Sequence, residues 1–265
     1  MKTRLSLSRS TVLRLFFLVP LLLAVACDFL IPALARNGFA ATWWHTLLTR
    51  TLCTVSVGAL MLFCDISPLR PTARLSLRRP WIAVAVTVGA FLVALNNLPA
   101  LALLTGGARV TSALPDLFLF AFGCLAIGFF EECLFRGFFL SFLLKKMQKN
   151  RRGRFLAVLI SSAAFGLIHL FNLAYGGGVG ATFLQVGYSF LIGGLLAALV
   201  LATGRLLPAA LCHALYDFCG RLVPVCGEGK LWDTPTVVIT VVLSVAVAAV
   251  TLLVLFDEGR EEVAA

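Results

Sequence analysis

The chain has 265 residues, of which 60% are hydrophobic and only 13% are charged. A soluble domain carries about 25% charged residues, so the composition excludes an ordinary soluble protein. The net charge of +10 could suggest nucleic-acid binding, but no polar domain is present to carry such a surface, and we expect no nucleic-acid partner. Apolar runs of about 20 residues recur instead, which indicates an all-α, polytopic bundle in a lipid bilayer.

The apolar runs predict about eight transmembrane helices in one integral membrane domain, residues 1–265. The first run, Leu13–Ala35, follows a basic N-terminus and resembles a signal peptide, but it is too long for one, so we expect an uncleaved first span. The later spans are expected near 43–65, 81–104, 117–144, 155–174, 182–203, 206–223 and 234–256.

The basic residues predict the orientation of these helices. Sixteen Lys and Arg fall in the N-terminus, the alternate loops 66–80, 145–154 and 204–205, and the C-terminal tail, whereas four fall in the opposite loops. The positive-inside rule then places both termini in the cytoplasm. From the general style of the sequence, we expect the membrane to be a bacterial plasma membrane.

Small residues mark one face of the expected helix 182–203. They are Gly193, Gly194, Ala197 and Ala198. Such faces allow helix backbones to approach closely, so we expect them to serve packing rather than catalysis.

Charged residues interrupt the apolar span 117–144 at one place only. Glu131, Glu132 and Arg136 lie there, although one charge at the centre of a membrane helix costs roughly 2.5–3.5 kcal/mol on insertion scales. Glu132 and Arg136 are four residues apart and share a helix face, so they can pair. Glu131 lies about 100° around the helix from Glu132, which leaves it as a candidate general base.

Two histidines lie in other apolar spans and could act with this acid. His169 shares a helix face with Phe165, and His213 shares a face with Asp217. Counting the helical rise from the basic loops places these groups within about two turns of the depth of Glu131. We therefore expect them to converge on one cavity.

In this order, the patterns Glu-Glu-x-x-x-Arg, Phe-x-x-x-His and His-x-x-x-Asp resemble the CPBP family of membrane proteases, which includes the type II CAAX prenyl endopeptidases. The resemblance implies an intramembrane endopeptidase that cuts a peptide or membrane-protein substrate near or within the bilayer, with a catalytic core at 117–217. It also implies a metal-free mechanism, so we expect no cofactor.

The resemblance implies a role for each residue of these patterns. Glu131 would be the general base that activates water, and His169 would help to hold that water. His213 and Asp217 would stabilise the oxyanion of the scissile carbonyl. The supporting residues would be Glu132, Arg136 and Phe165. Prenyl endopeptidases of the family typically have Asn at the position of Asp217, so Asp217 must be protonated, orient His213, or mark a divergent activity.

Two alternatives remain open at this stage. The two histidines, Glu131 and Asp217 are reasonable zinc ligands, which would make the protein a zinc-dependent intramembrane protease, although no His-Glu-x-x-His is present. The protein could instead be a non-catalytic immunity or partner-binding protein, because membrane bundles tolerate buried ion pairs. The eight cysteines form no CxxC pair and define neither a disulfide framework nor a zinc site.

Overall fold

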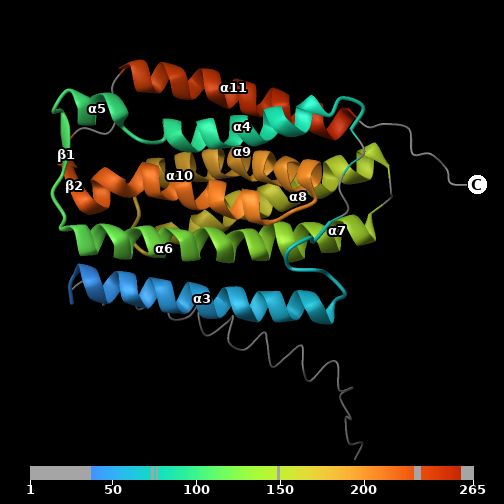
Figure 1. Ribbon diagram of the computed structural model, residues 1–265, viewed down its shortest axis with the longest axis horizontal. Coiled ribbons are helices and arrows are strands. Elements are labelled where there is room, and N and C mark those ends of the chain that lie inside the picture. Colours follow the sequence, from blue (N-terminus) through green and yellow to red (C-terminus); the bar gives the residue numbers. More distant parts are fainter. Residues whose placement is uncertain (1–36, 73–74, 76, 148–149, 230–233, 258–265) are drawn as a thin grey trace, which may run out of the picture.

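The computed structural model describes residues 37–72, 75, 77–147, 150–229 and 234–257 (Figure 1). The expected first span, Leu13–Ala35, lies outside these residues. The described helices are α3 (Phe39–Phe63), α4 (Trp81–Asn96), α5 (Ala100–Leu104), α6 (Leu114–Glu132), η1 (Cys133–Phe139), α7 (Leu140–Lys146), α8 (Arg151–Leu167), η2 (Ile168–Leu173), α9 (Val179–Thr203), α10 (Leu207–Cys226) and α11 (Thr234–Phe256).

The predicted all-α, polytopic architecture is confirmed. Five of the described helical stretches are long and apolar enough to cross a membrane, namely Phe39–Phe63, Leu114–Lys146, Arg151–Leu173, Val179–Thr203 and Pro235–Phe256. The cytoplasmic location of both termini stays a prediction. A short antiparallel ribbon of β1 (Ala108–Val110) and β2 (Gly227–Gly229) joins the chain before α6 to the end of α10.

Helix α10 lies inside the bundle and is not among those five stretches. It packs against α6, α4 and α9, and Figure 1 shows it between α4 and α6, with α3 and α11 at the two outer edges. The interior position fits its sequence, because α10 carries His213 and Asp217, and ionisable groups in a membrane bundle face away from lipid.

The prediction of one span over 81–104 is wrong. Helix α4 ends at Asn96, and a separate short helix, α5, begins at Ala100. Pro99 causes the break, because proline has no N–H to donate and disfavours helical geometry at Leu98. The side chain of Asn97 fixes the break against α10 by donating a hydrogen bond of 2.9 Å to the carbonyl of Tyr216.

The predicted span 117–144 is a continuous helix, but it contains a π-helical segment that the sequence did not predict. The segment η1 follows Glu132 directly, and the N–H of Leu140 donates to the carbonyl of Phe135, five residues earlier. The same carbonyl accepts a hydrogen bond of 3.0 Å from Ser161 on α8. A π-segment rotates the residues after it relative to an α-helix, and such segments are frequent at functional sites.

Glycine sets the distance between α6 and α10. A Cβ on Gly128 would lie 2.7 Å from the backbone nitrogen of Ala214 and 2.9 Å from the carbonyl oxygen of Ala210. Neither backbone atom can turn aside as a side chain can. The bare Cα of Gly128 therefore allows the helix that carries the glutamates to touch the helix that carries His213.

We expect Gly128→Ala to lower the stability of the protein by roughly 1–3 kcal/mol, the usual cost of overpacking a tight core. The measurement is thermal unfolding of the purified protein in detergent. Gly58→Ala on α3 is the matched control, because nothing lies within 4 Å of a Cβ at Gly58. The control should unfold at the wild-type temperature or slightly above it, and equal unfolding temperatures for the two variants would contradict the close contact.

Candidate active site

A fully buried ion pair lies where α6 passes into η1. Arg136 Nη1 lies 2.7 Å from Glu132 Oε1, and both side chains are 0% exposed. This is the pair predicted from the spacing of four residues, and the intervening π-segment does not prevent it. The pair brings a negative and a positive group into the apolar interior together, and their attraction offsets part of the cost of burying either charge alone.

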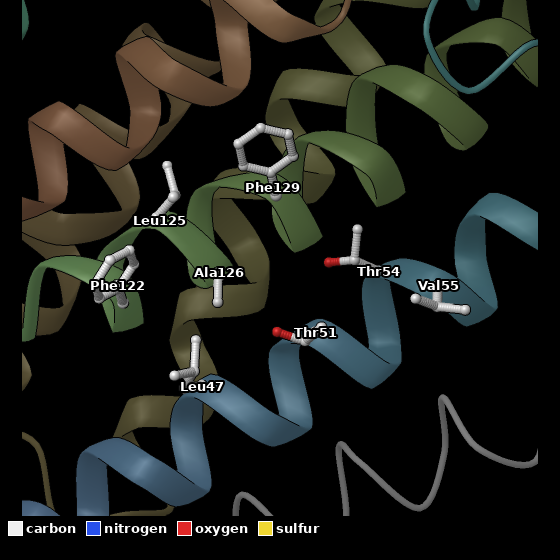
Figure 2. A pocket seen from close by; sticks show the side chains of 8 residues that line it. All are labelled: Leu47, Thr51, Thr54, Val55, Phe122, Leu125, Ala126 and Phe129. Atoms are coloured by element: carbon white, nitrogen blue, oxygen red, sulfur yellow. The ribbon is translucent and has the colours of Figure 1, made fainter. Parts of the chain in front are cut away.

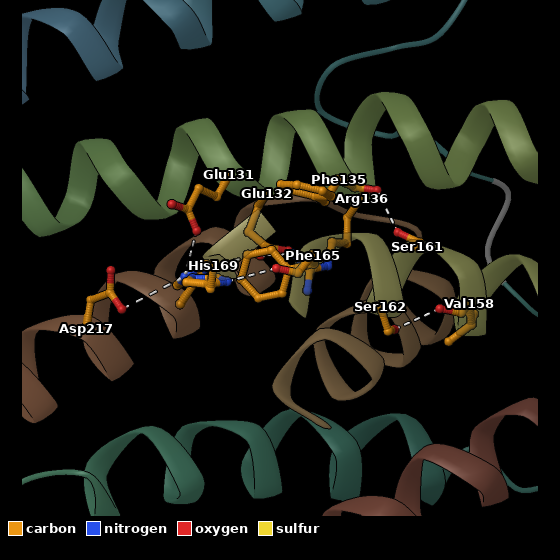
Figure 3. A network of polar contacts seen from close by, with 11 residues as sticks. Glu131, Glu132, Phe135, Arg136, Val158, Ser161, Ser162, Phe165, His169 and Asp217 are labelled. Carbon is orange, nitrogen blue, oxygen red and sulfur yellow. Dashed lines mark hydrogen bonds and ion pairs between the residues drawn. The ribbon is translucent and has the colours of Figure 1, made fainter. Parts of the chain in front are cut away.

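His213 joins this pair to two further carboxylates. Its Nδ1 lies 2.8 Å from Glu132 Oε1. Its Nε2 lies 3.5 Å from Glu131 Oε2 and 4.0 Å from Asp217 Oδ1. Figure 3 shows Glu131 and Asp217 directed from α6 and α10 toward the same polar centre. Three of the four predicted catalytic residues are therefore in direct contact around one imidazole ring.

The ring of Phe165 on α8 contacts Arg136 and both predicted histidines. The guanidinium carbon of Arg136 lies 4.2 Å above its centroid, a distance typical of a cation–π contact. The rings of His169 and His213 meet it edge to face, with centroids 5.3 and 5.5 Å away. Phe165 thus touches a buried cation and both predicted histidines.

His169 reaches this centre through Phe165 rather than through a carboxylate. It lies in η2, just after α8 ends, and its Nδ1 lies 2.9 Å from the carbonyl oxygen of Phe165. A carbonyl only accepts hydrogen bonds, so Nδ1 carries the proton, and in the neutral ring Nε2 keeps its lone pair. Among the described residues, no hydrogen bond or ion pair joins His169 to Glu131.

Exposure divides the two adjacent glutamates into different environments. The side chains of Glu131 and Asp217 are 21% and 20% exposed, whereas that of His213 is 5% exposed. Glu132 is fully buried behind them. A molecule that enters from the exposed side therefore meets Glu131 and Asp217 first, and the Glu132–Arg136 pair holds His213 from behind.

Residues 112–219 match the model of the family described as type II CAAX prenyl endopeptidase Rce1-like. This segment of the chain resembles that family. The predicted resemblance is confirmed, and all seven predicted site residues fall within the matched range. Comparisons with curated proteins and with solved structures found no match. The Rce1-like segment and the five candidate spans together support an integral membrane endopeptidase with a peptide substrate.

One residue of the Rce1-like segment that the sequence analysis missed is Ser161. Its hydroxyl is buried and donates to the carbonyl of Phe135, which ties η1 to α8 beside the site. Ser161, Phe165 and His169 are spaced by four residues, so they fall on one helix face. That spacing could have indicated that Ser161 faces the site. Its hydrogen bond could not be predicted, because the carbonyl of Phe135 belongs to a π-segment that the sequence did not reveal.

The site residues do not form a recognisable metal cage. Within the described part of the chain, no group of three or more His, Cys, Asp or Glu has positions that could hold a metal ion. His213 Nδ1 is directed at Glu132 and His169 Nδ1 at a backbone carbonyl, so one nitrogen of each ring is already engaged.

A separate cavity of about 260 Å³ lies between α3 and α6 (Figure 2). Its lining is mostly apolar and includes no predicted site residue: Leu47, Thr51, Thr54, Val55, Phe122, Leu125, Ala126 and Phe129. The hydroxyl of Thr54 donates to the carbonyl of Arg50 on its own helix. This cavity therefore offers mainly apolar surface, and its lining includes no acid, histidine or cysteine.

Removing Arg136 alone should lower the stability of the protein more than removing both members of the ion pair. Arg136→Met leaves the carboxylate of Glu132 buried without its cation, which costs roughly 3–5 kcal/mol in comparable pairs. The double variant Glu132→Gln/Arg136→Met removes both charges, so it should unfold at a higher temperature than Arg136→Met in the same detergent. A double variant that is less stable than Arg136→Met would argue against the pair as the support of this region.

Proposed function

We propose that the protein is a glutamate-dependent intramembrane endopeptidase, in which Glu131 takes a proton from a water molecule that attacks the scissile carbonyl. The observation that carries the proposal is the placement of Glu131 in a partly exposed position, 3.5 Å from His213 Nε2, while Glu132 is buried behind it. A general base must reach solvent and substrate, and of the two glutamates only Glu131 is partly exposed.

His213 is the proposed oxyanion donor. An ionised Glu132 can only accept a hydrogen bond, so Nδ1 is the donor, and a second proton on Nε2 would make the ring an imidazolium. Nε2 faces the carboxyl groups of Glu131 and Asp217, which favour a positive charge on the ring. The N–H on Nε2 would then stabilise the negative charge that develops on the carbonyl oxygen. One such donor is worth roughly 2.7–4 kcal/mol in the transition state.

His169 and Asp217 have supporting roles in this proposal. The lone pair on Nε2 of His169 can accept a hydrogen bond from the attacking water, because Nδ1 donates to Phe165. An ionised Asp217 would repel an oxyanion, so we propose that it does not contact the oxyanion. Its role is instead to orient the ring of His213, whose Nε2 lies 4.0 Å from Asp217 Oδ1. This role explains why an aspartate can stand where prenyl endopeptidases typically have asparagine.

The proposed substrate is a peptide bond near or within the bilayer. The family name makes a prenylated peptide with a C-terminal CAAX sequence the first candidate to test. We further propose that residues 117–217 form the catalytic core and that the protein resides in a bacterial plasma membrane with both termini in the cytoplasm.

Substitution of the proposed catalytic residues should abolish cleavage without preventing insertion. We expect Glu131→Gln and His213→Ala each to lower the cleavage rate by about 100-fold or more, since a general base contributes about 10²–10⁴-fold and an oxyanion donor about 10²–10³-fold. His169→Ala should also lower the rate, because it removes the proposed contact with the attacking water. The assay follows a farnesylated CAAX peptide and its unprenylated counterpart by mass spectrometry. Membrane fractionation confirms that each variant is inserted.

Cells provide the matching test if neither peptide is cut. Peptidomics of membranes that contain wild-type protein or Glu131→Gln should reveal fragments present only with the wild type, and a cut sequence then becomes the reporter. Glu131→Gln that retains full cleavage would refute the glutamate mechanism. Full biological activity of Glu131→Gln, with no difference in fragments, would favour a non-catalytic immunity or partner-binding protein.

A chelator separates the proposed mechanism from a zinc-dependent one. Because Glu131 activates water without a metal in this proposal, purified enzyme treated with 1,10-phenanthroline and then dialysed should keep its cleavage rate. The measurement is the same peptide assay before and after treatment. Activity that is lost on chelation and restored by added zinc would establish the zinc-dependent alternative.

A further inference from the structure

Gly193 on α9 lies against the two side chains that support the proposed site. A Cβ on Gly193 would lie 3.0 Å from Arg136 Nη2, 3.2 Å from Phe165 Cδ1 and 3.3 Å from the Cα of Ser162. These distances are shorter than ordinary van der Waals contact, so any larger residue at 193 must displace its neighbours. The absence of a side chain at this position therefore allows Arg136 and Phe165 to occupy their present places.

Neither neighbour of Gly193 can move without moving the proposed catalytic groups. Arg136 is fully buried and holds Glu132, which in turn holds His213 Nδ1. Phe165 packs edge to face against the rings of His169 and His213. A shift of Phe165 therefore acts directly on both imidazole rings, and a shift of Arg136 reaches His213 through Glu132.

The contact also affects the stabilisation of the buried cation. Among the described residues, Arg136 Nε and Nη2 have no hydrogen-bond partner. The positive charge is therefore stabilised by Glu132 on one side and by the face of Phe165, 4.2 Å from the guanidinium carbon. A methyl group at 193 would press on Nη2 and on the edge of that ring, and so would disturb the only cation–π geometry that Arg136 makes with α8 in the described chain.

We propose that Gly193 is a positioning residue for the hydrolytic reaction, because its bare Cα sets the places of Arg136 and Phe165 and, through them, of both histidines. The inference rests on the proposed function. It also refines the expectation that Gly193 and Gly194 serve packing alike, because their surroundings differ. A Cβ on Gly194 would meet Thr251 Cγ2 at 3.6 Å and Ser162 Oγ at 3.8 Å, which is ordinary contact.

The test compares Gly193→Ala with Gly194→Ala, a control that makes the same chemical change one residue along the same helix. Both substitutions raise helix propensity equally. We expect Gly193→Ala to lower kcat about tenfold, since a misplacement of about 1 Å can cost about 100-fold and the displacement here is a fraction of that. KM should change by less than about twofold, and Gly194→Ala should keep both constants near wild type. Equal kcat values for the two variants overturn the inference.

A double-mutant cycle tests whether the effect passes through Phe165. Phe165→Leu removes the ring edge that the new methyl group would press on, so Gly193→Ala should lower kcat by no more than about threefold in that background. Full additivity of the two effects would contradict the part of the inference in which Gly193 sets the place of Phe165. If Gly193→Ala alone fails to accumulate, recovery of accumulation in Gly193→Ala/Phe165→Leu supports the inference, and failure of both contradicts it.

The inference and the proposed function can fail separately. Glu131→Gln that still cleaves the reporter refutes the glutamate mechanism, whatever Gly193→Ala does. Inactive Glu131→Gln together with fully active Gly193→Ala keeps the mechanism and refutes the positioning role. The pH dependence of kcat adds a readout that general loss of packing would not move, because displaced histidines should shift the profile of Gly193→Ala but not that of Gly194→Ala.

Discussion

The buried contact between Glu132 and Arg136 is the interaction on which the rest of the site depends. Each charge alone would be expensive in the apolar interior, and together they are tolerated because the nitrogen and oxygen lie 2.7 Å apart with no exposure to solvent. The pair also has a fixed direction. Glu132 faces His213 on α10, and Arg136 faces Phe165 on α8 and Gly193 on α9. The ion pair therefore contacts residues of α8, α9 and α10, and it positions these helices around the site as well as neutralising its own two charges.

Helix geometry explains which contacts of the site could be predicted from the sequence. A spacing of four residues correctly predicted that Glu132 would pair with Arg136 and that His213 would lie on the same face as Asp217. These contacts lie within one helix, where the period alone decides which side chains meet. The transmembrane helical character was equally accessible, because it follows from apolar run length.

The features that the sequence did not predict involve contacts between helices or departures from the α-helix. The sequence predicted that His213 and Glu131 would converge on one cavity, but not that His213 would contact both glutamates, because this contact depends on the close approach of α6 and α10 at Gly128. The π-segment after Glu132 has no sequence period of its own. The break before α5 could have been predicted from Pro99, but the apolar character of residues 81–104 suggested one span. The ring of Phe165 was identified only as a neighbour of His169, whereas its contacts with Arg136 and His213 come from tertiary packing.

Two adjacent glutamates can serve different purposes because an α-helix turns about 100° between neighbours. Here that rotation places Glu132 in the fully buried interior beside Arg136 and leaves Glu131 at the partly exposed edge, with His213 between them and in contact with both. The buried carboxylate has its charge committed to a cation and to Nδ1 of the imidazole, so it is poorly suited to accept a further proton during a reaction. The partly exposed one faces Nε2 of the same ring. A single imidazole therefore has one nitrogen held by a fully buried acid and the other directed toward a partly exposed one, and this asymmetry underlies the different roles proposed for the two glutamates.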